Sequence, residues 1–261
     1  ITDGANSLNG NTIPHVSWNW KANGSGSANT DGNMAETVTV SANTDAGFSI
    51  VTYTGDGSTA TVGHGLSKAP EFIVVKTRNN TGDWMAYHSG NTAAPETDFL
   101  KFNENNATED LAAVWNDTAP TSSVFTIGDN TDVNVDDRTY VAYCFHSVDG
   151  YSKVGSYNGN ADADGTFVYT GFRPAFVIIK PSSRGGHWFM ANNESNPYNV
   201  VDKVILTNDS AAEYTDPAAD CKKDFLSNGF KLRTADDNTN DDETYIYLAF
   251  AETPFKYANA R

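Results

Sequence analysis

The segment Ala69-Pro-Glu-Phe-Ile-Val-Val-Lys76 occurs a second time, slightly altered, as Arg173-Pro-Ala-Phe-Val-Ile-Ile-Lys180. Its two prolines, Pro70 and Pro174, stand 104 residues apart. Each copy is a short run of β-branched and aromatic residues, which is typical of a β-strand. We therefore expect a strand in both places. Self-similarity at a fixed spacing indicates a repeated unit, so the flanking sequence should recur as well.

Four further strings recur in the same order and at nearly the same offset. They are Gly47-Phe-Ser-Ile-Val51 with Gly150-Tyr-Ser-Lys-Val154, Gly82-Asp-Trp84 with Gly186-His-Trp188, Val124-Phe-Thr-Ile127 with Gly229-Phe-Lys-Leu232, and Thr139-Tyr-Val-Ala-Tyr-Cys-Phe145 with Thr244-Tyr-Ile-Tyr-Leu-Ala-Phe250. Asn-Gly and Asp-Gly pairs separate such runs, and these pairs favour tight turns between strands. The pattern predicts an all-β chain of two tandem antiparallel β-sandwich or jelly-roll-like modules, residues 47–149 and 150–261, related by internal duplication.

Residues 1–46 remain outside the two copies. Within them, His15-Val-Ser-Trp-Asn-Trp20 resembles Tyr140-Val-Ala-Tyr-Cys-Phe145, so we expect the terminal strand of a preceding unit there. The stretch 21–46 is polar and predicts a long loop or linker. Two explanations stay open: the rest of that unit lies upstream in a longer parent chain, or the strand pairs with the second copy or with a neighbouring subunit.

Alternation along the last strand of each copy predicts which side chains enter the cores. We expect these to be Val141, Tyr143 and Phe145 in the first copy and Ile246, Leu248 and Phe250 in the second. Cys144 lies on the opposite face, where the second copy has Ala249. The position therefore favours a small apolar filler over a disulfide with Cys221.

The charge and the motifs exclude several classes of function. The chain has 33 acidic residues against 17 Lys and Arg, a formal net charge of −16, which disfavours binding to the phosphates of nucleic acids. No apolar run of about 20 residues could span a bilayer. The sequence has no GxSxG elbow, no Walker A loop and no HExxH motif, and no strand carries a pair of carboxylates at alternate positions. We therefore expect a protein that is not an enzyme.

Acidic residues gather in two equivalent loops, each just before the last strand of its copy. They are Asp129, Asp132, Asp136 and Asp137 in the first and Asp236, Asp237, Asp241 and Asp242 in the second. Such loops are either solvated turns or sites that bind calcium or a partner. A second calcium candidate is Asn160-Ala-Asp162-Ala-Asp164-Gly165, which begins like an EF-hand loop. It has Gly171 where the bidentate Glu would stand, so we expect no cofactor, with calcium as a possibility.

The tryptophans divide into two groups. Trp84 and Trp188 occupy equivalent positions in the two copies, which indicates duplicated core residues. Trp115 is followed by Asn116 and Asp117 in a polar stretch, which predicts an exposed ring. An exposed indole can stack on a sugar, so Trp115 joins the eight loop aspartates as a candidate contact residue.

Several strings resemble a repeated β module found in virion structural proteins, often called tail fibres, of marine tailed bacteriophages. Among them are Val62-Gly-His-Gly-Leu66, Phe167-Val-Tyr-Thr-Gly-Phe-Arg-Pro174, Asp224-Phe-Leu-Ser-Asn-Gly-Phe230, Tyr245-Ile-Tyr-Leu-Ala-Phe-Ala-Glu252 and Pro254-Phe-Lys-Tyr-Ala-Asn-Ala-Arg261. The resemblance covers nearly the whole chain. It implies a non-enzymatic component of the phage exterior that touches other virion proteins and contacts a host surface glycan or protein, as a homo-oligomer, by analogy a trimer. It supplies no binding residues.

Two alternatives remain at this point. One is a head decoration or fibre-shaft module that contacts only virion proteins. The other is a secreted carbohydrate-binding module.

Overall fold

A computed structural model describes residues 16–215 and 221–254, and their secondary structure is almost entirely β. The first half contains β1 (Ser27–Asn29), β2 (Val38–Asn43), β3 (Phe48–Thr54), β4 (Ala60–Gly63), β5 (Phe72–Thr77), β6 (Met85–His88), β7 (Asp98–Lys101), β8 (Glu109–Asp110), α1 (Ala112–Trp115), β9 (Val124–Ile127) and β10 (Thr139–Phe145). The second half contains β11 (Ser152–Asn158), β12 (Phe167–Tyr169), β13 (Pro174–Pro181), β14 (Phe189–Asn192), β15 (Lys203–Leu206), β16 (Tyr214–Thr215), β17 (Lys223–Leu226), β18 (Gly229–Leu232) and β19 (Thr244–Ala251). Among these described residues no helix is long and apolar enough to cross a membrane.

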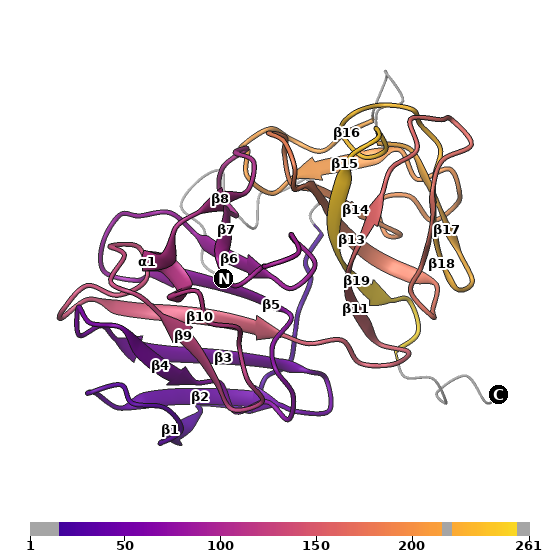
Figure 1. Cartoon of the computed structure of the whole chain (residues 1–261). Helices are drawn as coiled ribbons and strands as arrows, with labels where there is room; N and C mark the ends of the chain where they lie inside the picture. Colours follow the sequence, from indigo (N-terminus) through magenta and orange to yellow (C-terminus); the bar gives the residue numbers. More distant parts are fainter. Residues whose placement is uncertain (1–15, 216–220, 255–261) are drawn as a thin grey trace, which may run out of the picture.

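Each half forms an antiparallel β-sandwich, as predicted (Figure 1). In the first module an eight-stranded sheet, β1-β2-β3-β10-β5-β6-β7-β8, packs over the two-stranded sheet β4-β9. In the second module a six-stranded sheet, β11-β19-β13-β14-β15-β16, packs over the three-stranded sheet β12-β18-β17. Each pair of sheets encloses its own apolar core, because alternate residues of the facing strands point between the layers.

The strand orders of the two large sheets correspond element by element. In the first, β10 lies between β3 and β5, and in the second, β19 lies between β11 and β13. The smaller sheets correspond as well, because Val62 pairs with Phe125 where Val168 pairs with Phe230. The two modules therefore share one strand arrangement in their large and small sheets.

The facing of the last strand in each copy was predicted wrongly. Tyr140, Ala142 and Cys144 of β10 enter the first core, and Tyr245, Tyr247 and Ala249 of β19 enter the second. The opposite faces of these strands are also apolar, because they meet a third cluster that lies between the modules. Its buried members from the first module include Phe72, Val74 and Leu100, and those from the second include Phe176, Ile178, Trp188, Ile246, Leu248 and Phe250. Cys144 is buried in the first core and forms no disulfide with Cys221, so the filler prediction for Cys144 is confirmed.

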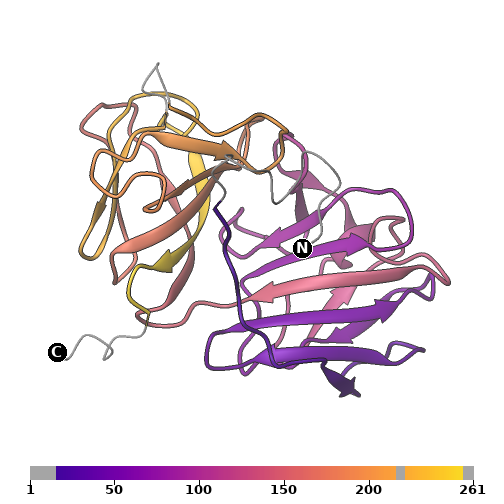
Figure 2. The ribbon, with the colours of Figure 1, turned by 180° about the vertical axis from the view of Figure 1, so that it is seen from behind.

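The segment Val16–Trp20 completes this cluster, and Figure 2 shows it running between the two modules. Trp20 lies 5.2 Å from Phe250 and 6.2 Å from Phe145, between ring centroids. The segment is not part of any sheet, so the prediction of a terminal strand was wrong. The segment is held by the packing of Trp18 and Trp20 against the third cluster. His15 lies outside the described residues.

The stretch 21–46 is not the polar linker that was expected. Val38–Asn43 forms β2, which pairs with β3 and so extends the first sheet beyond its counterpart in the second module. The equivalent edge of the second sheet ends at β11. There Val148 bridges Ser152, and the backbone N–H of Val154 donates to the Ser147 hydroxyl at 3.0 Å.

Polar contacts fasten the two modules around the third cluster. The indole Nε1–H of Trp188 donates to the carbonyl oxygen of Lys101 at 3.0 Å. The backbone N–H of Thr108 donates to the carbonyl oxygen of Ser182, also at 3.0 Å. His88 at the end of β6 reaches the backbone carbonyl of Tyr247 in β19. Apolar burial and specific hydrogen bonds together fix one relative placement of the modules.

Candidate functional site

Trp115, the candidate for an exposed stacking ring, is buried and has 2% of its surface exposed. It ends α1, and its ring meets that of Tyr87 edge-to-face at 6.2 Å. The polar residues after it, Asn116 and Asp117, adopt positive φ and end the helix. The polar neighbours therefore mark a turn, and the prediction of an exposed Trp115 was wrong.

The first acidic loop is held on its core side by two stacked tyrosines, Tyr53 and Tyr140, whose ring centroids lie 5.2 Å apart. We call such a tyrosine pair, together with the buried asparagine between its two contacts, a tyrosine–asparagine clamp. The hydroxyl of Tyr53 donates to the carbonyl of Val133 at 2.7 Å, and that of Tyr140 accepts from the N–H of Val135 at 2.9 Å. Between them, the fully buried Asn134 binds the β3–β4 turn through its side chain. The backbone of the loop is thus fixed from the core side.

The second acidic loop has the same clamp. Tyr157 and Tyr245 stack at 5.2 Å; the first donates to the carbonyl of Thr239 at 2.6 Å and the second accepts from the N–H of Asp241 at 2.9 Å. The buried residue between them is Asn240. The two loops are therefore held by matching residues in both modules.

The loop carboxylates differ in exposure and in hydrogen-bond partners. Asp129, Asp136, Asp137 and Asp242 are exposed. Asp132 accepts the backbone N–H of Asp83, and Asp237 pairs with Arg184 at 3.3 Å. The carboxylate of Asp236 accepts the backbone N–H of Asn238 within the loop. Burial raises the pKa of the Asp236 carboxyl, and the negative charge of the neighbouring Asp237 raises it further. Asp241 accepts the N–H of Asp242. Among the described residues no three His, Cys, Asp or Glu side chains converge as metal ligands would.

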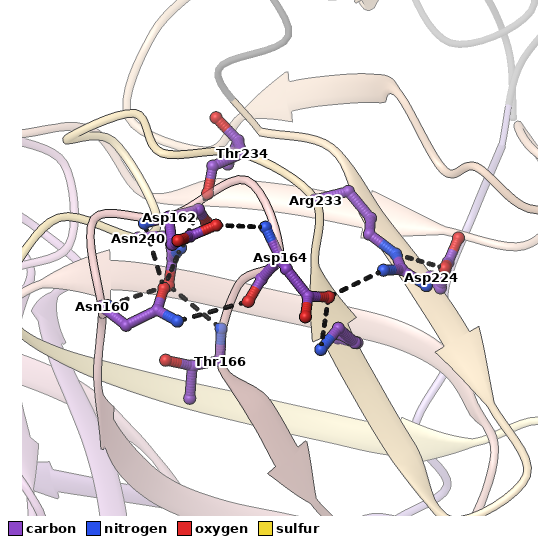
Figure 3. Close-up of polar contacts among 9 residues, drawn as sticks. Asn160, Asp162, Asp164, Thr166, Asp224, Arg233, Thr234 and Asn240 are labelled. Carbon is purple, nitrogen blue, oxygen red and sulfur yellow. Dashed lines mark hydrogen bonds and ion pairs between the residues drawn. The ribbon is translucent and has the colours of Figure 1, made fainter.

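The side chain of Asn240 holds the calcium candidate loop through hydrogen bonds (Figure 3). The Asn240 amide donates to Asn160 Oδ1 at 2.8 Å and to the Asp162 carbonyl at 2.9 Å. Asp162 Oδ1 accepts the N–H of Asp164 at 2.8 Å. The Asp164 carboxylate pairs with Lys231 at 2.9 Å, and this bond holds its pKa below the usual range. A calcium ion would have to displace these partners.

The second module also carries a surface that the sequence reading missed. On β12, Val168 points into the core while Phe167 and Tyr169 point outward, with 43% and 66% of their surfaces exposed. Beside them on β18, Lys231 stands opposite Phe167 and Gly229 stands opposite Tyr169. Gly229 has no side chain, and the Phe167 ring lies over it. The sheet that carries these residues, β12-β18-β17, lies on the side of the second module away from the first, where Figure 1 labels β17 and β18.

Charged side chains continue this surface across the sheet. Arg233 lies between two carboxylates, with Nε 2.6 Å from Asp224 and Nη1 3.4 Å from Asp164 (Figure 3). Lys231 pairs with Asp164 as well. We call the outer surface made by Phe167, Tyr169, Gly229, Lys231 and Arg233 the aromatic face.

The first module has no aromatic face. Thr61 and Gly63 of β4 stand where β12 has Phe167 and Tyr169, on either side of the matching valines. Residues that precede β2 cover them: Asn33 bonds the backbone of Thr61 in both directions, and a Cβ on Gly63 would collide with Asn29. The alternation in Phe167-Val-Tyr169 could have revealed the face, if Val168 had been recognised as the inward residue.

An apolar hollow of about 400 Å³ lies between the modules. The Val16–Trp20 segment forms one wall, through Trp18 and Trp20, and the opposite walls include Phe145 and Phe176. The hollow belongs to the intermodule cluster.

The chain belongs to the family described as a domain of unknown function (DUF7483), whose model matches residues 2–254. No curated protein and no solved structure matches the chain.

Proposed function

We propose that this chain is a structural protein of a bacteriophage virion, carried on a tail fibre or similar exterior appendage, where its loops contact the host cell surface. The resemblance of its repeated strings to virion modules gives the class of protein. The observation that carries the contact role is the pair of tyrosine–asparagine clamps. They fix the backbone of both acidic loops and leave carboxylates such as those of Asp136, Asp137 and Asp242 in solvent.

Rigidly held loops on a sheet scaffold suit recognition, because the loop pays little ordering entropy on binding. An acidic loop does not adhere by charge to an anionic cell envelope. Contact then goes through neutral groups, through a protein receptor or through divalent cations that bridge two sets of carboxylates.

The test uses the purified, fluorescently labelled chain in a co-sedimentation assay with host cells. We expect binding to the cells, and weaker binding by the variant Asp136→Asn/Asp137→Asn/Asp242→Asn. The matched control, Glu36→Gln/Asp45→Asn/Asp209→Asn, removes three exposed carboxylates elsewhere and should bind like the parent chain. Addition of EDTA reports whether divalent cations bridge the contact.

Antibody labelling of intact particles locates the chain. Labelling of an appendage together with cell binding agrees with the proposal. Labelling of the head, or of a shaft with no cell binding by the chain, would favour the decoration or shaft role. A chain absent from particles would contradict the virion assignment.

A further inference from the structure

We infer that the aromatic face of the second module binds neutral polysaccharide chains. The inference deepens the proposed function by naming a class of receptor, and it rests on that function only for the source of the glycan. It uses different residues from the acidic loops, so the two can be tested separately.

The two rings are placed as a stacking surface. Phe167 and Tyr169 stand two residues apart on β12, which sets their bases about 7 Å apart along the strand. Tyr169 is 66% exposed and Phe167 is 43% exposed, although aromatic rings of this size usually bury most of their area. The apolar C–H face of a pyranose ring packs on such a ring, and a ligand that touches both rings must extend along the strand.

Polar groups beside the two rings supply hydrogen-bond donors and acceptors on the same side of the sheet. Arg233 uses Nε and Nη1 for its carboxylate partners, and its Nη2 has no partner among the described residues. The hydroxyl of Tyr169 is likewise without a partner in the part of the chain that the structure describes. The Asp164 carboxylate, 79% exposed, can accept further hydrogen bonds beside Lys231. Sugar hydroxyls both donate and accept, so they match a mixed set of this kind.

The charges of the face favour a neutral ligand. Lys231 and Arg233 are each paired with a carboxylate, Asp164 or Asp224, so these four groups balance. The chain as a whole carries −16. An acidic polysaccharide would be repelled by the chain and would find the two cations already neutralised.

The same observations disfavour a protein as the occupant. The centre of a protein–protein interface is depleted of charged residues. Here an ion-pair network lies directly beside the rings, and burying it under a protein would carry a desolvation cost. A polysaccharide keeps such groups hydrated while it covers the rings.

The experiment is affinity gel electrophoresis of the full chain in gels that contain dextran, laminarin, galactomannan or xyloglucan, with alginate as the acidic comparison. We expect retardation by at least one neutral polysaccharide. Phe167→Ala and Tyr169→Ala should each weaken it about tenfold, since each removes one stacking ring. Tyr169→Phe, which keeps the ring, should retain most of it.

Tyr198→Ala is the matched control, because Tyr198 is 83% exposed but lies in the loop between β14 and β15, whose next residue Asn199 bonds β17 at the edge of the sheet opposite β12. It should leave retardation unchanged. Circular dichroism and thermal melting verify that the variants fold, which is expected because both substituted rings are on the surface.

Three results would overturn the inference: no retardation by any neutral polysaccharide in the set, retardation that survives loss of both rings, or retardation by alginate alone that is abolished by salt. If cell binding then persists, the proposed function stands without the aromatic face. Conversely, ring-dependent retardation without cell binding or particle labelling would uphold the inference and contradict the proposed function.

Discussion

The imidazole of His88 lies 3.2 Å from the backbone carbonyl oxygen of Tyr247, and this bond joins the first module to β19, an inner strand of the second module's large sheet. A carbonyl only accepts, so Nε2 carries the proton, and Nδ1 accepts the N–H of Gly90 at 3.1 Å. The ring is therefore held neutral. Burial lowers the pKa of His88 from 6.5 to about 4, against the smaller raising effect of the Tyr247 carbonyl.

His88 should make the stability of the chain depend on pH. The unfolded ring takes up a proton below its ordinary pKa of 6.5, whereas the folded ring does so only near 4. Stability is then fully present above pH 6.5 and falls as pH decreases toward 4, by about 3 kcal/mol for a shift of this size. Guanidinium unfolding at pH 7.5 and at pH 4.5 measures the decrease.

The variant His88→Asn isolates this contribution, because Asn192 stands at the matching position of β14. Burial also lowers the pKa of His64, and acidic groups titrate in the same range, so the decisive quantity is the difference in slope between parent and variant. Equal slopes would contradict the role of His88.

Replacement of Asn240 should loosen the second module. Its amide donates to Asn160, Asp162 and Thr234, and its oxygen accepts two backbone N–H groups. Asn240→Ala leaves these buried groups unpaired, so we expect a loss of about 3 kcal/mol in the free energy of unfolding. Chemical denaturation measures it, with the half-buried Asn238→Ala as control; a loss below about 1 kcal/mol would mean that water replaces the amide.

Calcium should leave the melting temperature unchanged. The carboxylate of Asp164 already has Lys231 and Arg233 as partners, and the Asn160 side chain is bonded to Asn240. We expect the same melting temperature in EDTA and in millimolar calcium, since only a ligand that prefers the folded state raises it. A rise with calcium that disappears in Asp162→Asn would instead establish the site.

Trp20 should stabilise the packing of the two modules. Its ring contacts Phe145 of the first module and both Phe176 and Phe250 of the second. Trp20→Ala enlarges the apolar hollow, and we expect a cost of about 2–3 kcal/mol, less than for a fully buried ring. Limited proteolysis and small-angle scattering should also show freer modules, whereas the exposed neighbour Asn19→Ala should match the parent in all three measurements.

The sequence predicted the fold class well because strand alternation and turn residues are local signals. It failed where a strand is apolar on both sides. Val141, Tyr143 and Phe145 resembled core residues, yet Tyr140, Ala142 and Cys144 fill the core. The first set lies on the face toward the second module, and alternation alone cannot distinguish a core from an interface.

The candidate site was harder to predict for a related reason. Trp115 has polar neighbours in sequence but apolar neighbours in space, because α1 turns it into the first core. Phe167 and Tyr169 have the opposite arrangement, since they lie in an apolar run but face solvent. Only the three-dimensional pairing of Val168 with Phe230 decides which side of β12 is outward.

The contacts at the outer edge of β11 have a consequence for how copies of this chain behave when crowded. An open sheet edge is a template on which strands of other molecules add, and such addition leads to fibrillar aggregates. At β11 the bridge from Val148 to Ser152 and the Ser147 hydroxyl on Val154 already occupy ladder groups of that edge. Neighbouring copies held at high local density are thereby hindered from fusing their sheets through this strand.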